Sequence, residues 1–208
     1  MSEFQTEEEQ VEAIKRWWKE NGTSVIAGLV VGLGGVFGWQ AWGNYKDRIG
    51  AEAALAFNQV VVAVDRGDRA SASKQAELMR SNYDNSSYAV FAAMAEARVK
   101  LDEGDTATAI SRLEWAVQRA DNLALKRLVQ LNLARILLSE GELDGAEKLV
   151  QSEEGGFAGE YAVVRGDIAL ARGDKAAAAA AYTQAMTLEV SNRNLLQMKL
   201  DDLATNTP

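Results

Sequence analysis

The sequence predicts an all-α protein in which one membrane-spanning helix is followed by repeated antiparallel helix hairpins. Three observations lead to this fold class. One long apolar run lacks charge and has aromatic residues at both borders, and glycine–acid pairs recur at near-constant spacing after it. Strand-like alternation is absent apart from the short run at residues 60–62, which lies within a helical pattern.

The first element is a transmembrane helix, predicted at residues 21–45. No charged residue occurs between Glu20 and Lys46, and residues 23–42 form an apolar core of 20 residues. A helix of that length spans about 30 Å, the thickness of the hydrocarbon core. Interfacial aromatic residues border the run at Trp17, Trp18, Trp39, Trp42 and Tyr45. The alternatives are a buried helix of a soluble protein and a cleavable signal peptide ending at residues 41–43, which would have a shorter apolar region.

Five glycines interrupt this run, although glycine disfavours helices in water. At 100° per residue they fall within an arc of roughly 160°, and bulky side chains such as Leu29 and Phe37 occupy the opposite face. Small residues let membrane helices approach closely. The sequence therefore predicts a membrane-partner face made of Gly28, Gly32, Gly34, Gly35 and Gly38.

The basic residues that flank the run give its orientation. Lys15, Arg16 and Lys19 precede it, whereas only Lys46 and Arg48 follow it closely. Because Lys and Arg favour the cytoplasmic side, we expect a cytoplasmic tail at residues 1–20 and an exported domain at residues 46–208.

The composition of the exported domain removes most enzymatic chemistry. The chain has no histidine and no cysteine, so a thiol nucleophile and the usual general base are absent, and we expect no cofactor and no metal site. Its net charge is negative, which disfavours nucleic acid. Glu153 and Glu154 are the one local carboxylate cluster, and we interpret them as a solvated helix end before two glycines.

A repeat organises the exported domain. Glycine–acid pairs begin at Gly67, Gly104, Gly141 and Gly173, with spacings of 37, 37 and 32 residues. Each glycine precedes an alanine by five residues, at Ala72, Ala109, Ala146 and Ala178. Glycine suits a tight turn, and an acidic residue suits the start of the next helix. The pattern predicts four helix hairpins.

The hairpins resemble tetratricopeptide repeats, most clearly in YAVVRGDIALARGDKAAAAAAYTQAM at residues 161–186. The resemblance implies a tetratricopeptide-like superhelix. The chain departs from that family because its single proline is Pro208 and two spacings exceed the usual repeat.

In such a superhelix the first helix of each hairpin lines the concave face. The register set by Gly104 and Gly141 aligns three residues of one first helix with three of the next. The predicted binding surface therefore consists of Phe91, Met94, Arg98, Leu128, Leu131 and Arg135. In the alternative interpretation Met94 and Leu131 belong to the core, and the arginines are solvated or pair with glutamates such as Glu96.

The order of parts along the chain resembles the YfgM family. It comprises an acidic start, QVEAIKRWWKENG, the glycine-rich span, GNYKDRIGAEAALAFNQVV, the repeats and a closing NLLQMKLDDLA. This resemblance implies an ancillary subunit of the SecYEG translocon, with its repeat domain in the periplasm and its anchor in the lipid bilayer of the bacterial inner membrane. It also implies a membrane-anchored periplasmic chaperone of the parvulin class and exported unfolded polypeptides as partners. The alternatives are a membrane-tethered scaffold for another envelope assembly and a carboxylate-based glycan-cleaving enzyme.

Overall fold

The structure is a computed structural model that describes residues 7–151 and 155–205, and these residues contain nine α-helices and no strand. The all-α prediction is confirmed. The chain divides into two compact units, Met1–Ala51 and Glu52–Pro208. Helix α1 (Glu7–Asp65) contributes to both.

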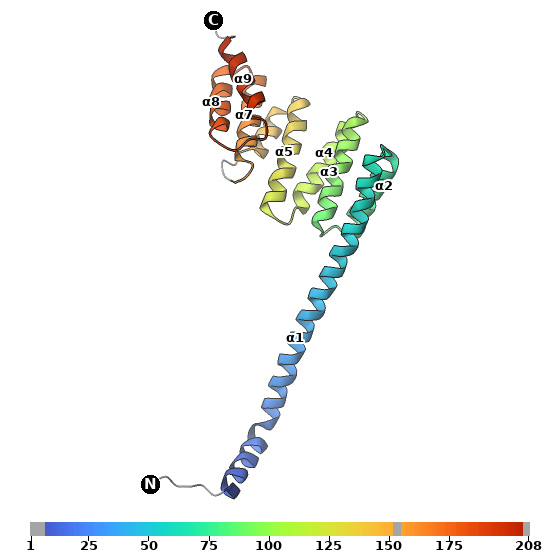
Figure 1. Cartoon of the computed structure of the whole chain (residues 1–208), viewed down its shortest axis with the longest axis vertical. Helices are drawn as coiled ribbons and strands as arrows, with labels where there is room; N and C mark the ends of the chain where they lie inside the picture. The colour runs from blue at the N-terminus through green and yellow to red at the C-terminus, as the bar shows by residue number, and fades with distance from the viewer. Residues whose placement is uncertain (1–6, 152–154, 206–208) are drawn as a thin grey trace, which may run out of the picture. The chain divides into compact units, whose positions relative to one another are not determined.

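The described residues of the first unit form the N-terminal part of α1, drawn in blue in Figure 1. Among the described residues, α1 is the one helix long and apolar enough to cross a membrane by length and composition. The predicted span at residues 21–45 lies wholly inside it. Its large apolar side chains, among them Leu29, Val31 and Phe37, are exposed.

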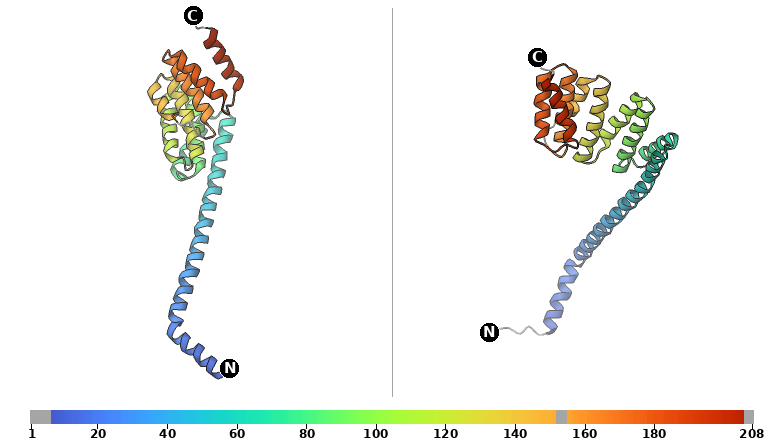
Figure 2. Two further views of the ribbon diagram at one scale, coloured as in Figure 1. Left: turned by 90° about the vertical axis from the view of Figure 1, so that its left-hand side faces the viewer. Right: turned by 45° about the horizontal axis from the view of Figure 1, so that its top comes forward.

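The second unit is a series of antiparallel hairpins (Figures 1 and 2). The C-terminal end of α1 shares buried clusters with α2, and Ala63 of α1 packs with Ala72 of α2 in one of them. Each later hairpin has a first and a second helix. The helices are α2 (Arg69–Asn82), α3 (Ser87–Asp102), α4 (Thr106–Arg119), α5 (Leu123–Ser139), α6 (Leu143–Leu149), α7 (Ala158–Ala171), α8 (Lys175–Met186) and α9 (Arg193–Thr205). The four predicted hairpins are therefore present, and α9 follows them.

The glycine–acid pairs form the turns within the hairpins. Gly67, Gly104, Gly141 and Gly173 have φ between 70° and 82°, a left-handed conformation that favours glycine. The acidic residue after three of them caps the next helix. Asp105, for example, accepts a hydrogen bond from the Thr108 backbone N–H at 3.1 Å. The Thr108 side chain, followed by this backbone N–H, lowers the pKa of Asp105.

Small residues allow the helices of each hairpin to approach closely. The repeated alanines Ala72, Ala109, Ala146 and Ala178 are fully buried. In the last hairpin, Gly166 lies directly against the ring of Tyr182, so that an added Cβ would come within 2.3 Å of ring carbon Cε1. At these positions the helix face contains little more than backbone, so the two helices of a hairpin can lie close together.

A buried ionic cluster connects three helices of the first two hairpins. Glu96 of α3 is only 3% exposed, and its carboxylate pairs with Arg80 of α2 and with Arg112 of α4, the latter at 3.0 Å. Burial, followed by the nearby charge of Arg112, lowers the pKa of Arg80 to about 10. One carboxylate therefore balances two guanidiniums here.

Candidate functional site

The first helices α3 and α5 border a hollow of about 320 Å³. Its lining is mostly apolar, with two arginines and one asparagine as the polar members. The lining residues are Met94, Ala97, Arg98, Leu101, Leu113, Asn132, Arg135 and Ile136. None of these described lining residues is a carboxylate.

A second hollow of about 290 Å³ continues from Arg135 toward the C-terminal helix α9. It is bordered by α5, α7, the segment before α9, and α9 itself. Its lining residues are Arg135, Glu160, Val163, Val164, Asp167, Val190, Ser191, Asn192, Leu195, Leu196 and Lys199. We call the two hollows, which share Arg135, the inner groove.

The structure brings three of the six predicted surface residues together. Met94, Arg98 and Arg135 line the first hollow. Leu131 is 3% exposed and belongs to the core, as the alternative interpretation expected. Met94 and Leu128 are both half-buried and pack against that core. Phe91 lies outside the hollow, with its ring centroid 6.2 Å from that of Phe57.

The two arginines of the inner groove have different partners. The Arg98 side chain is 77% exposed, and its Nε lies 3.2 Å from Asp102 Oδ1, one turn along the same helix. Arg135 Nη2 lies 2.8 Å from Glu160 Oε2 of the next hairpin. Glu96, which we considered as their partner, pairs instead with Arg80 and Arg112.

Glu160 organises the middle of the inner groove. Its second oxygen accepts a hydrogen bond from the Ser191 backbone N–H at 2.6 Å. Burial raises the pKa of Glu160, but the Ser191 hydrogen bond and the charge of Arg135 outweigh burial, and the pKa lies below its usual value. The carboxylate therefore stays ionised near neutral pH.

Asp167 occupies the C-terminal end of the inner groove. Its Oδ1 accepts a hydrogen bond from the Tyr182 hydroxyl at 2.5 Å and pairs with Lys199. Burial, together with this hydrogen bond, raises the pKa of Tyr182. Sequence reasoning missed Glu160, Asp167 and Lys199. Asp167 lies six residues before Gly173, as Arg135 lies six before Gly141, so the repeat register could have found it. Lys199 lies after the last glycine–acid pair, so the repeat spacing gives no register for it.

The inner groove has the chemistry of a binding surface. Apolar side chains make up most of its lining, and its charged members are three basic residues and two acidic ones, Arg98, Arg135, Lys199, Glu160 and Asp167. In the parts of the chain that the structure describes, no three His, Cys, Asp or Glu side chains gather as a metal site. Glu153 and Glu154, on which a glycan-cleaving reaction would rest, lie outside the described residues.

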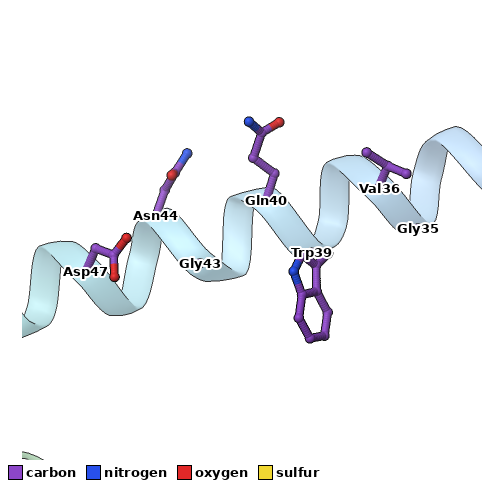
Figure 3. A pocket seen from close by; sticks show the side chains of 7 residues that line it. All are labelled: Gly35, Val36, Trp39, Gln40, Gly43, Asn44 and Asp47. Atoms are coloured by element: carbon purple, nitrogen blue, oxygen red, sulfur yellow. The ribbon is translucent and has the colours of Figure 1, made fainter.

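The predicted membrane-partner face lies on an ordinary stretch of α1. At each of its five glycines, an added Cβ would meet no heavy atom within 4 Å in the described structure. Close by, the helix surface is hollowed around Gly35 and Gly43, where Gln40 and Asn44 extend to one side and Trp39 to the other (Figure 3). Whether these glycines contact a partner stays a prediction.

Comparison with known proteins gives a consistent result over the whole chain. A family described as tetratricopeptide repeat-like domain matches residues 15–205. Proteins named ancillary SecYEG translocon subunit from Haemophilus influenzae and Aggregatibacter actinomycetemcomitans are each 30% identical over 199 residues, covering 95% of this chain and 97% of each relative. The Escherichia coli protein of that name is 28% identical over 207 residues, covering 98% of this chain and 100% of the relative.

These relatives and the apolar helix α1 together fit a single-pass protein of the inner membrane that is associated with the translocon. The match extends through the span and the repeats, so it concerns the whole organisation of the chain. The chain belongs to the tetratricopeptide repeat-like family of ancillary SecYEG translocon subunits, the YfgM family.

Proposed function

We propose that this protein is anchored beside the SecYEG translocon by α1 and holds segments of exported polypeptide in the inner groove of its periplasmic domain. The groove then assists handover of these segments to a membrane-anchored periplasmic chaperone of the parvulin class. The names of the relatives support the translocon, and the family resemblance suggests the chaperone.

The observation that carries the proposal is the meeting of Met94, Arg98 and Arg135 around one apolar hollow. An extended segment could place an apolar side chain against the floor, which includes Leu101 and Ile136. The guanidiniums would then bind its backbone carbonyls or acidic side chains. The contacts need no particular sequence, which suits a protein that meets many exported chains.

Arg98 is well suited to exchange partners. An exposed ion pair one turn apart on a helix is worth only about 0.3–0.5 kcal/mol, so little is lost when Arg98 leaves Asp102 for a ligand. Arg135 is held more firmly, because Glu160 is itself fixed by Ser191. We infer that Arg98 moves on binding and that Arg135 marks the fixed centre of the groove.

The orientation belongs to the same proposal, because the groove must face the exported chain. With residues 1–20 in the cytoplasm and residues 46–208 in the periplasm, protease added to spheroplasts digests the repeat domain and spares the tail. Protection of the repeat domain would contradict this orientation.

The groove is tested by replacing Arg98 and Arg135 together with Gln and crosslinking the full-length protein to a translocating chain. The matched control replaces Arg66 and Arg69, which are exposed near the first turn. We expect a several-fold loss of crosslinking in the groove variant only, with unchanged helicity. Undiminished crosslinking in a folded variant would remove these arginines from the binding surface.

A further inference from the structure

The N-terminal stretch of α1, residues 9–20, is amphipathic. Its large apolar side chains, which are 48–67% exposed, fall within roughly 120° of the helix circumference. They are Val11, Ile14, Trp17 and Trp18. All charged side chains of this stretch fall within roughly 140° on the other side. They are Glu9, Glu12, Lys15, Arg16, Lys19 and Glu20.

Helix α1 changes direction in its dark-blue N-terminal part (Figure 2). Nearby, the Asn21 side chain donates a hydrogen bond from Nδ2 to the Trp17 carbonyl at 3.0 Å. A side chain that bonds to the carbonyl of the preceding turn competes with the helix ladder and favours bending. The Trp18 indole covers Gly22, where an added Cβ would lie 3.2 Å from ring carbon Cε2.

We propose that residues 9–20 lie in the plane of the membrane surface, with Val11, Ile14 and the two tryptophans at the boundary between headgroups and acyl chains. The occupant of this apolar face is thus the bilayer itself. The argument is continuity, because the predicted span begins at residue 21 and keeps this stretch beside the membrane. An upright continuation would place Val11 about 15 Å outside the hydrocarbon and leave it in water.

The composition of the stretch fits this position. Indole rings favour the membrane interface, where an apolar body and a polar N–H are both accommodated. Three basic and three acidic side chains balance across residues 9–20, so attachment depends on apolar burial rather than on anionic lipid. We therefore expect the same placement in purely zwitterionic vesicles.

The chain has no cysteine, so single cysteines give unambiguous labels. Spin labels are placed in the full-length protein by Val11→Cys and Ile14→Cys on the apolar face, and by Glu12→Cys and Arg16→Cys on the charged face. Each variant is reconstituted in phosphatidylcholine vesicles. Collision with oxygen, which is enriched in lipid, is compared with collision with a water-soluble nickel chelate.

We expect the oxygen-to-nickel ratio to be several-fold higher at positions 11 and 14 than at positions 12 and 16. Four equally water-accessible positions would overturn the proposal, because they indicate an upright helix or a face reserved for a protein partner. Four equally lipid-accessible positions would also overturn it, because the stretch would then lie inside the span. These outcomes do not depend on the inner groove.

Discussion

The glycines of the predicted span and the glycines of the hairpin turns differ in backbone conformation. Gly67, Gly104, Gly141 and Gly173 have positive φ, so the backbone of the repeat domain itself requires them. The glycines at 28–38 have ordinary helical backbone and no neighbour at the place of a Cβ. The described structure gives no reason for glycine at these positions, and we predict that their role lies in the lipid or in contact with another membrane helix.

The side chains of the repeat domain and of the N-terminal unit differ in a similar way. In the repeat domain, the buried carboxylate of Glu96 has two guanidinium partners within the domain. In the N-terminal unit, the apolar side chains of α1 are exposed along its length. Buried charge in the repeat domain is thus paired within that domain, whereas the apolar side chains of the predicted span are exposed in the described structure. Substitutions in the two regions should therefore have different effects on the free energy of unfolding of the repeat domain. This unfolding can be followed through Trp115, the one tryptophan after residue 42, once the other four tryptophans are replaced by Phe.

The largest effect is expected from Glu96→Ala. Its removal leaves Arg80 and Arg112 facing one another in a largely buried place, and breaking such a pair costs about 3 kcal/mol. Urea unfolding of the repeat domain should show this loss in the free energy of unfolding. Glu96→Gln, which keeps a hydrogen-bond acceptor and the side-chain volume but removes the charge, should lose nearly as much, and a much smaller loss would show that charge balance is not the cause.

Gly166→Ala should cost about 2 kcal/mol, because the added methyl overlaps the buried ring of Tyr182 and the ring must move. The contact is tested by combining it with Tyr182→Leu, which vacates the space. The double variant should lose less stability than the sum of the single variants. Additive losses would assign the cost of Gly166→Ala to something other than this contact.

Gly141→Ala sharpens the comparison between the two sets of glycines. Alanine at a φ of 80° costs about 1–2 kcal/mol, whereas Gly34→Ala places its methyl in open space on a regular helix. Urea unfolding should show a lower stability of the repeat domain for the first variant and no change for the second. A loss of domain stability from Gly34→Ala would show that the turn glycines and the span glycines do not differ in this way.

The smallest effect on stability is expected from Gly32→Leu and Gly35→Leu, which lie outside the repeat domain. If the glycine face contacts a membrane helix, these bulky side chains should weaken co-purification of SecYEG from mild detergent while the domain unfolds as before. Leu33→Ile, on the opposite face, is the control. Equal recovery of SecYEG with all three variants would count against a docking face.

The hairpins and part of the groove could be predicted because the signals are local. A glycine and an acidic residue set each turn, and the repeat spacing aligns Arg98 with Arg135, which line the same hollow. The pairing of Arg135 with Glu160 and of Lys199 with Asp167 was not predicted, because each joins residues from different helices far apart in sequence. The burial of Glu96 was missed for the same reason, since its partners lie 16 residues away on either side.

Site-specific photocrosslinking to a translocating chain tests the central claim most directly. A photoreactive residue at Met94 lies in the inner groove on α3, whereas one at the exposed Leu78 of α2 lies outside the groove lining. We expect crosslinks to the exported chain from position 94 and few from position 78, in full-length protein in inner-membrane vesicles. Equal crosslinking from both positions, or crosslinking from position 78 alone, would contradict a groove that holds exported polypeptide.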